Sequence, residues 1–470
     1  MPVPVISVAQ MREWEKISWA AGQTESEVIR RVGKAVADVA LRLSLPGETI
    51  LLLAGKGHNG DDVRAAHEHL TGRRVVELLD VTAPESDLEK LEAAFARRPA
   101  LAVDGLFGIG LNRPLDATWT AFIERINQSQ LPVLAVDVPS GLNADTGDNF
   151  GSAIVAAVTL TVGAPKLGLL QPMAGPFVGR LEVAHDVGLS PCPHTSELLW
   201  TLPEDFTGFP PRRPAAAHKG DFGHLAIIAG SLGYHGAAVL ATRGAQRAQP
   251  GLITLLTQES VYHAVATQLQ AAMVNVLRPE TKLPGEFDSF LIGPGLAAPE
   301  LKDMKMITRK IWRDIVMSVV VDASALDWLP LDPVPKNAVR VITPHPGEAA
   351  RLLNSTTKQV QSDRPRAVRE ISKRFGNCWV VLKGQHTLIG RSTGEIFVNS
   401  SGNPHLAQGG SGDALAGFIA GLLAQPVLQA DPGRTLRYAV WQHGHAADRL
   451  QATRRNWVVE ELFEKLGNLD

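Results

Sequence analysis

Apolar residues recur every three or four positions in the first part of the chain, and short apolar runs replace this pattern further on. The spacing over residues 7–21 and 25–43 predicts two amphipathic helices. After them, apolar runs typical of buried strands alternate with helical patterns, which predicts a parallel sheet covered by helices on both faces. The expected strands are 49–54, 75–79, 101–103, 133–136 and 158–162, and the expected helices between them are 64–70 and 87–97.

A second region of the same kind follows a proline-rich stretch. Residues 189–217 lack periodicity and carry many prolines, so we interpret them as a linker between domains. Strand–helix alternation then resumes, and the sequence predicts an α/β protein with one domain at 1–205 and another at 206–470. The strands expected in the second domain are 224–229, 253–256, 290–292, 319–321, 339–342 and 379–382.

Composition excludes several classes of protein. The 470 residues include 46 Lys and Arg against 48 Asp and Glu, and 45% are apolar, which argues against a disordered chain and against nucleic acid as the main partner. The N-terminus lacks a secretory pattern, and no apolar stretch approaches the roughly 20 residues of a membrane span. The two cysteines cannot form a disulfide framework. We therefore expect a cytoplasmic protein with no membrane partner.

The first glycine loop follows the expected strand 49–54. Gly55, Gly57 and Gly60 have the spacing Gly-x-Gly-x-x-Gly, which allows a phosphate to approach the backbone at a helix N-terminus. Asp80 lies about 20 residues further on, where a ribose-binding acid would be. The pattern suggests a dinucleotide-binding Rossmann unit. A tight strand–helix turn without a ligand remains an alternative.

Oxygen-bearing side chains follow three of the expected strands. Asp104 and Asp137 each end an apolar run, Ser140 follows Asp137, and Asn59 lies in the first glycine loop. The carboxyl ends of parallel strands share one edge of a sheet, so these groups would converge. They contain no histidine or cysteine and therefore suit a hard cation better than zinc. Asp104 and Asp137 could instead cap turns, and Lys166 on its own is expected to be a solvated loop lysine.

Four segments of the first half, AGKGHNGDD, VDGLFGIGLNRPL, VLAVDVPSGLNADTG and LTVGAPKLGLL, resemble the NAD(P)H-hydrate epimerase domain in order and spacing. The resemblance covers nearly all of residues 1–190. It implies a Rossmann-like three-layer domain that epimerises hydrated nicotinamide cofactors at the hydroxyl-bearing ring carbon. It also implies a potassium ion held by Asn59, Asp104 and Ser140, with Asp137 in acid–base catalysis. The implied substrate residues are His58, Asn59, Gly60, Asp61, Asp62, Gly108, Ile109, Gly110, Leu111, Asn112, Arg113, Pro114 and Asp137.

Two segments depart from this family's usual residues. Where the family has Asn-Asn-Gly-Gly-Asp-Gly, this chain has His-Asn-Gly-Asp-Asp-Val at 58–63. Where the family has Met-Glu-Asn-Ala-Gly, this chain has Ile-Arg-Arg-Val-Gly at 29–33. Replacing two loop glycines removes permissive backbone and adds bulk. A first half that binds a ligand without epimerising it is therefore an alternative.

The most specific motif of the second half is Gly-Gly-Ser-Gly-Asp at 409–413, which leads directly into an apolar helix. The glycine amides and the helix N-terminus would stabilise a transferring phosphoryl group. Asp413 opens the helix, where it could take a proton from an attacking hydroxyl. A plain N-cap role for Asp413 is the alternative, although a cap does not require four small residues before it.

Together with loops at the ends of several expected strands, this motif resembles the ADP-dependent NAD(P)H-hydrate dehydratase of the ribokinase-like fold group, over roughly residues 210–470. The resemblance implies that Ala237, Gly295, His345 and Asp413 contact the hydrated cofactor. It implies that Gly412 and the loop Lys383, Gly384, Gln385, His386 and Thr387 contact the adenosine nucleotide. Asp322 ends another expected strand, and Ser324 stands where the family usually has a second aspartate.

The implied reaction makes a poor leaving group into a good one. ADP, with magnesium, would phosphorylate the substrate hydroxyl, and loss of phosphate would regenerate the reduced nicotinamide. The two halves together would repair both epimers of hydrated NADH and NADPH. The resemblance also implies a homo-oligomer. A small-molecule kinase of the same fold group remains an alternative, and it would stop at a stable phosphorylated product.

Overall fold

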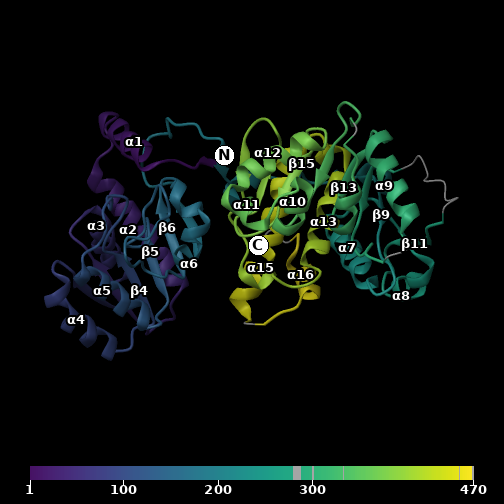
Figure 1. The fold of residues 1–470 in the computed structure, drawn as a ribbon. Coiled ribbons are helices and arrows are strands. Elements are labelled where there is room, and N and C mark those ends of the chain that lie inside the picture. The colour runs from purple at the N-terminus through teal and green to yellow at the C-terminus, as the bar shows by residue number, and fades with distance from the viewer. Residues whose placement is uncertain (279–286, 299–300, 332, 455, 468–470) are drawn as a thin grey trace. The chain divides into compact units, whose positions relative to one another are not determined.

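A computed structural model describes residues 1–278, 287–298, 301–331, 333–454 and 456–467 (Figure 1). The chain divides into two compact units, one formed by Val3–Trp200 and the other by Thr201–Asp470 with Met1–Pro2. Each unit contains a largely parallel sheet with helices on its faces, so the expected α/β fold class is confirmed. None of the helices in these described ranges is both long enough and apolar enough to cross a membrane.

The sheet of the N-terminal unit has the strand order β3-β2-β4-β5-β6-β7, and all its neighbouring strands pair in parallel. Strands β1 and β8 pair with each other in antiparallel orientation. The strands are β1 (Val3–Pro4), β2 (Thr49–Ala54), β3 (Val75–Asp80), β4 (Leu101–Gly105), β5 (Val133–Val136), β6 (Val158–Val162), β7 (Arg180–Ala184) and β8 (Leu198–Trp200). The helices are α1 (Val8–Ala20), α2 (Glu25–Arg42), α3 (His58–Leu70), α4 (Pro84–Ala96), α5 (Ala117–Gln128) and α6 (Gly175–Val178).

Strand β2 shows why this sheet is buried on both sides. Ile50 and Leu52 face a core shared with α2 and α3, whereas Leu51 and Leu53 face a second core shared with α4 and α5. Successive side chains of a strand point to opposite faces, so an uninterrupted apolar run requires two covered faces. The chain turns from β2 to β3 on one side and to β4 on the other. At this reversal, the carboxyl ends of β2 and β4 form the position where open α/β sheets bind ligands.

The sheet of the C-terminal unit has the order β17-β16-β15-β14-β13-β12-β9-β10-β11. Strands β9 to β15 run parallel, and β16 and β17 add an antiparallel edge. The strands are β9 (His224–Ile228), β10 (Leu252–Thr257), β11 (Met273–Val276), β12 (Ser289–Ile292), β13 (Ser318–Val321), β14 (Arg340–Ile342), β15 (Trp379–Leu382), β16 (Leu388–Gly390) and β17 (Ile396–Val398). The helices are α7 (His235–Ala248), α8 (Tyr262–Ala266), α9 (Lys302–Asp314), α10 (Pro346–Leu353), α11 (Thr357–Ser362), α12 (Arg364–Arg374), α13 (Ser411–Leu423), α14 (Pro426–Gln429), α15 (Pro432–Thr453) and α16 (Val459–Lys465).

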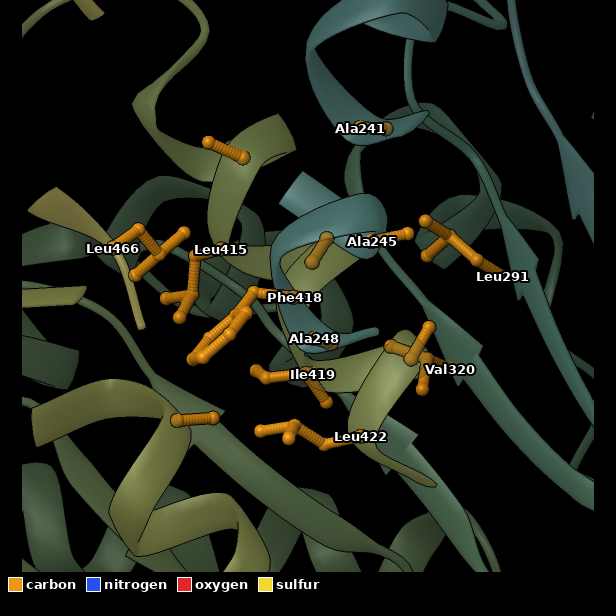
Figure 2. Close-up of a cluster of buried hydrophobic side chains, with 14 of the residues drawn as sticks. Ala241, Ala245, Ala248, Leu291, Val320, Leu415, Phe418, Ile419, Leu422 and Leu466 are labelled. Carbon is orange, nitrogen blue, oxygen red and sulfur yellow. The ribbon is translucent and has the colours of Figure 1, made fainter. Parts of the chain in front are cut away.

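Helices α7 and α13 cross at the centre of this unit. Alanines of α7 pack against Leu415, Phe418 and Leu422 of α13, beside Leu291 of β12 and Val320 of β13 (Figure 2). A Cβ atom at Gly417 would overlap the carbonyl oxygen of Ala241, and one at Gly244 would overlap that of Ala414. The two backbones can approach this closely only because both positions are glycine.

Several elements differ from the expected ones. Helix α3 begins at His58, six residues before the expected helix, because Gly57 is extended and the chain turns helical immediately after it. Helix α5 and the strands β7, β11, β16 and β17 were not among the expected elements. The expected linker contains β8, whose three residues are too few to show a period.

Candidate active sites

A chain of hydrogen bonds joins the three residues expected to hold a cation. The Asn59 amide nitrogen donates to the carbonyl oxygen of Phe107 (3.0 Å), and the Phe107 N–H donates to Ser140 Oγ (2.9 Å). Ser140 Oγ in turn donates to Asp104 Oδ1 (2.6 Å). Asn59 in the first turn of α3, Asp104 near the end of β4 and Ser140 after β5 therefore come together at the carboxyl edge of the sheet.

The surroundings of Asp104 suit a hard cation. Its side chain is fully buried, and burial raises its pKa to about 6, although hydrogen bonds from Ser140 and Leu106 oppose this rise. A buried carboxylate is costly unless a positive charge or hydrogen bonds compensate it. The amide, hydroxyl and carboxylate oxygens of Asn59, Ser140 and Asp104 are the donor types that bind alkali and alkaline-earth ions.

Asp137 and Lys166 form a buried ion pair close to this edge. Asp137 adopts a left-handed backbone conformation (φ 61°), and its Oδ1 accepts from Lys166 Nζ at 2.6 Å. Lys166 is fully buried and also donates to the carbonyl oxygen of Val162 (2.7 Å). The expectation of a solvated loop lysine was wrong. Lys166 lies four residues after the end of β6, and its side chain turns back to the strand end, where it contacts Thr161 and Asp137.

Two further carboxyl groups lie near Asp137. Asp62, in the first turn of α3, is 8% exposed, and burial together with the charges of Asp137 and Asp61 raises its pKa well above the usual range. Glu15 of α1 also has a raised pKa, first because of burial and then because of Asp137. Asp62 was among the expected substrate residues, whereas Glu15 was not. The available signal for Glu15 was its position four residues after Met11, which is buried.

Two of the residues that depart from the family pattern, His58 and Asp61, form ion pairs at the surface. His58 is exposed and forms an ion pair with Glu25 (3.0 Å). Asp61 pairs with Arg64 (2.9 Å), which also binds Asp80 (2.8 Å). Asp80, considered above as a ribose-binding acid, is thereby part of a surface ion-pair network.

Val63 belongs to the core of the N-terminal unit. It is fully buried, and its side chain occupies the space that a Cβ atom of Gly105 would need. The absence of a side chain at Gly105 thus accommodates the bulk of Val63. Gly60 permits a close backbone contact, since a Cβ atom there would overlap the carbonyl oxygen of Gly55.

The expected substrate segment 108–114 follows β4 as irregular structure. Gly108 lies against the side chain of Asn59, because a Cβ atom built there would be 3.3 Å from Asn59 Cγ. Ile109 packs against the cluster that contains Met11 and Trp14 of α1. Gly110, Asn112, Arg113 and Pro114 are exposed, and Leu111 is half-buried. Gly108 is therefore the member of this segment that the structure places beside the cation ligands.

In the C-terminal unit, the expected phosphoryl site lies at the N-terminus of α13. Gly410 caps the helix with φ 94°, and Gly412 and Asp413 form its first turn. A Cβ atom at Gly412 would lie 3.3 Å from Lys383 Nζ and 4.0 Å from Asp322 Oδ2. The glycine motif therefore brings the helix N-terminus close to a lysine from the end of β15 and an aspartate from the end of β13.

Charged groups surround Asp413. Lys383 Nζ donates to Asp322 Oδ1 (2.8 Å) and lies 3.9 Å from Glu348 Oε2. Burial, then the charge of Asp322, raises the pKa of Asp413 to about 7, and Lys383 opposes this rise. A carboxyl group with this pKa can exchange a proton near neutral pH. Glu348 was not among the expected site residues, and its position beside Lys383 could not be inferred from the sequence.

Three of the expected substrate contacts follow the strands β9, β12 and β14. Ala237 lies in the first turn of α7, and Gly295 (φ 65°) follows β12, where a Cβ atom would be 2.9 Å from Ala237 Cβ. His345 caps α10, and its Nδ1 accepts from the N–H of Gly347 (3.0 Å). All three follow the carboxyl ends of parallel strands, as the sequence predicts. Ser324 lies in the 3₁₀ turn Ala323–Trp328, two residues after Asp322.

The expected nucleotide loop, 383–387, is held by a residue that sequence reasoning missed. Arg364, the first residue of α12, donates from its guanidinium to the carbonyl oxygens of Leu382 (3.1 Å) and His386 (3.3 Å). It also donates to those of Lys383 (3.4 Å) and Gln385. Its position 19 residues before the loop gave no signal in the pattern of the chain.

Known proteins resemble both units. A family model described as NAD(P)H-hydrate dehydratase matches residues 225–467, and a model described as YjeF-related protein N-terminus matches residues 73–168. The crystal structure of the ADP/ATP-dependent NAD(P)H-hydrate dehydratase from Bacillus subtilis, co-crystallised with ATP and Mg²⁺, is 29% identical with a TM-score of 0.51, covering 56% of this chain and 95% of its own. A ribokinase-like superfamily protein from Enterococcus faecalis is 25% identical with a TM-score of 0.50, covering 58% of this chain and 95% of its own.

Two curated relatives match nearly the whole chain. The bifunctional NAD(P)H-hydrate repair enzyme Nnr from Gloeobacter violaceus is 34% identical over 99% of this chain and 97% of its own length. The enzyme of the same name from Escherichia coli is 33% identical over 95% of this chain and 90% of its own length. Similarity of this extent across both units shows that the chain belongs to the family of bifunctional NAD(P)H-hydrate repair enzymes.

Proposed function

We propose that this chain restores hydrated NADH and NADPH in two steps. Residues 1–205 interconvert the two epimers of the hydrate, and residues 206–470 dehydrate one epimer with ADP, releasing AMP and phosphate. The observation that carries the proposal is the position of Asp413 and Lys383 at the N-terminus of α13. A base, a cation and helix N–H groups at one point are what phosphoryl transfer from a nucleotide requires.

The dehydration follows from these groups. Asp413, in its ionised form, accepts the proton of the substrate hydroxyl as the oxygen attacks the β-phosphorus of ADP. Lys383 and the first-turn N–H groups of α13 stabilise the transferring phosphoryl group. The ring nitrogen then donates its electron pair as the phosphate leaves, and loss of a proton from the neighbouring carbon restores the double bond. Magnesium, with the nucleotide phosphates and Asp322 as ligands, would neutralise developing charge.

Epimerisation needs an acid and a base at one ring carbon. Asp62, whose pKa is raised by burial and by Asp137, is suited to donate a proton to the departing hydroxyl. The ring nitrogen forms a double bond to the carbon as water leaves. Asp137, paired with the Lys166 ammonium, then accepts a proton from the water that adds on the opposite face. A potassium ion held by Asn59, Asp104 and Ser140 would supply fixed positive charge at the same edge of the sheet.

Recovery of the reduced-nicotinamide absorbance from a racemic NADHX mixture tests the proposal. With ADP, magnesium and potassium present, we expect complete recovery, faster than spontaneous epimerisation allows. Recovery that stops at half would show an active dehydratase beside a silent first domain. A stable phosphorylated product without recovery would indicate a kinase, and no reaction would contradict the dehydratase assignment.

Location and assembly remain proposals. The substrates arise from the cellular pool of reduced nicotinamide nucleotides, so we place the enzyme in the cytoplasm. We also propose a homo-oligomer, which light scattering coupled to size-exclusion chromatography would test. Nucleic acids and membranes are not expected partners, because the chain carries no strong excess of basic residues.

A further inference from the structure

The nucleotide loop 383–387 has an unusual backbone. Gly384 has φ 133° and His386 has φ 51°, so two of its five residues adopt left-handed conformations. Glycine adopts such a conformation freely, whereas His386 keeps it only where surrounding groups hold it. The guanidinium of Arg364 contacts this loop and donates to carbonyl oxygens within it and to that of Leu382 just before it.

These hydrogen bonds determine the direction in which the peptide groups point. The C=O and N–H of a trans peptide lie on opposite sides of the bond. The carbonyl oxygens of Lys383 and His386 face Arg364, so the N–H groups of Gly384 and Thr387 point away from it. The same geometry holds at Leu382, where the following N–H, of Lys383, donates to the carbonyl oxygen of Pro344 on the other side. The carbonyl oxygen of Gln385 also accepts from Arg364, so the successive N–H groups of His386 and Thr387 both point away from it. Successive N–H groups turned one way form a concave binding site for anionic oxygens.

We propose that Arg364 is the positioning residue of the nucleotide loop, and that it turns the N–H groups of Gly384 and Thr387 toward the bound ADP. This inference rests on the proposed dehydratase function and adds a residue that does not itself touch the nucleotide. Only an arginine presents several N–H donors in one rigid plane, so a lysine cannot replace its four contacts. Gly384 belongs to the same arrangement, since a Cβ atom there would lie 3.3 Å from Arg364 Nη2.

The test compares variants of the full-length enzyme. For Arg364→Lys and Arg364→Ala we expect the KM for ADP and the Kd for ADP, measured by calorimetry, to rise at least tenfold, while the KM for NADHX changes less than twofold. Arg366→Ala is the matched control. Arg366 lies on the same helix, is exposed and pairs only locally with Glu370 (2.7 Å), so its removal should change neither constant.

Gly384→Ala provides a second route to the same result. It leaves Arg364 in place but strains the loop backbone, and we expect the same selective loss of ADP binding even if Arg364→Ala does not fold. Folded Arg364 variants with unchanged ADP binding would overturn the inference. So would equal losses for ADP and NADHX together with a lower melting temperature. Calorimetry reports ADP binding independently of turnover, so failure of the proposed reaction would be distinguishable from failure of this inference.

Discussion

The carboxyl groups of the two sites differ in what surrounds them, and this difference assigns their chemistry. Asp137 lies against the buried ammonium of Lys166, which stabilises its negative charge. Asp62 is buried and Asp413 is half-buried, and for each of them desolvation and neighbouring carboxylates favour the protonated form and raise the pKa. A carboxyl group with a raised pKa beside a carboxylate paired with an ammonium is an arrangement that suits acid–base catalysis.

The pKa of Asp413 predicts the pH dependence of dehydration. Asp413 must be ionised to accept the hydroxyl proton, and its pKa is about 7. We therefore expect kcat/KM with ADP to fall about tenfold per pH unit below 7 and to level off above it. Asp413→Asn should lower the rate by about 10²- to 10⁴-fold and remove this dependence. A flat profile from pH 6 to 8 in the unsubstituted enzyme would contradict the assignment.

The proposed potassium site predicts an ion-specific effect on stability. A ligand at ten times its Kd stabilises the folded state by about 1.4 kcal/mol. We expect potassium chloride to raise the melting temperature of the N-terminal unit by a few degrees relative to choline chloride at equal ionic strength. Asp104→Asn keeps the shape of the side chain but removes its charge, so it should abolish the difference. An equal potassium effect in that variant would exclude Asp104 as a ligand.

At the scale of elements, the crossing of α7 and α13 depends on Gly244 and Gly417. Gly417→Ala would place a methyl group on the carbonyl of Ala241, so the helices must separate. We expect a loss of about 1–3 kcal/mol in the free energy of unfolding, measured by urea denaturation. Gly236→Ala in α7 is the control, because no atom lies within 4 Å of the added Cβ, and it should change stability by less than about 1 kcal/mol. Similar values for the two variants would contradict the close approach.

The elements that could be predicted are those with long or repeated patterns. Apolar runs identified β2, β5 and β6, and the spacing in residues 7–43 identified α1 and α2. Strands β16 and β17 have three residues each, too few to establish a period. The Asp116 N-cap marks the start of α5 and was a usable signal that the apolar pattern alone did not reveal.

For the sites, motif residues could be predicted and their supporting residues could not. Asn59, Asp104 and Ser140 converge because each lies at or after the carboxyl end of a strand, and strand ends share an edge. Lys166, Glu348 and Arg364 act through contacts between segments distant in the sequence, and a single sequence does not report such contacts. The environment of these three residues is therefore set by tertiary packing and not by the local sequence pattern.

At the scale of the whole molecule, one chain carries two active sites whose contributions can be separated. Asp137→Asn should leave dehydration intact, so racemic NADHX would recover rapidly to about half and then proceed only at the spontaneous rate of epimerisation. Asp413→Asn should abolish recovery while the epimers continue to interconvert, as chromatography would show. Complete rapid recovery in Asp137→Asn would exclude Asp137 from epimerisation.

The close crossing of α7 and α13 also limits how such enzymes can be recombined. Ala237, a proposed substrate contact, is in the first turn of α7, and Asp413 is in the first turn of α13. Because each glycine fits against the backbone of the opposite helix, α7 and α13 must be exchanged together. If the homologue that donates α13 has a larger residue at the position of Gly244 or Gly417, the chimera must also take that homologue's α7. Recombination boundaries therefore belong outside residues 235–423.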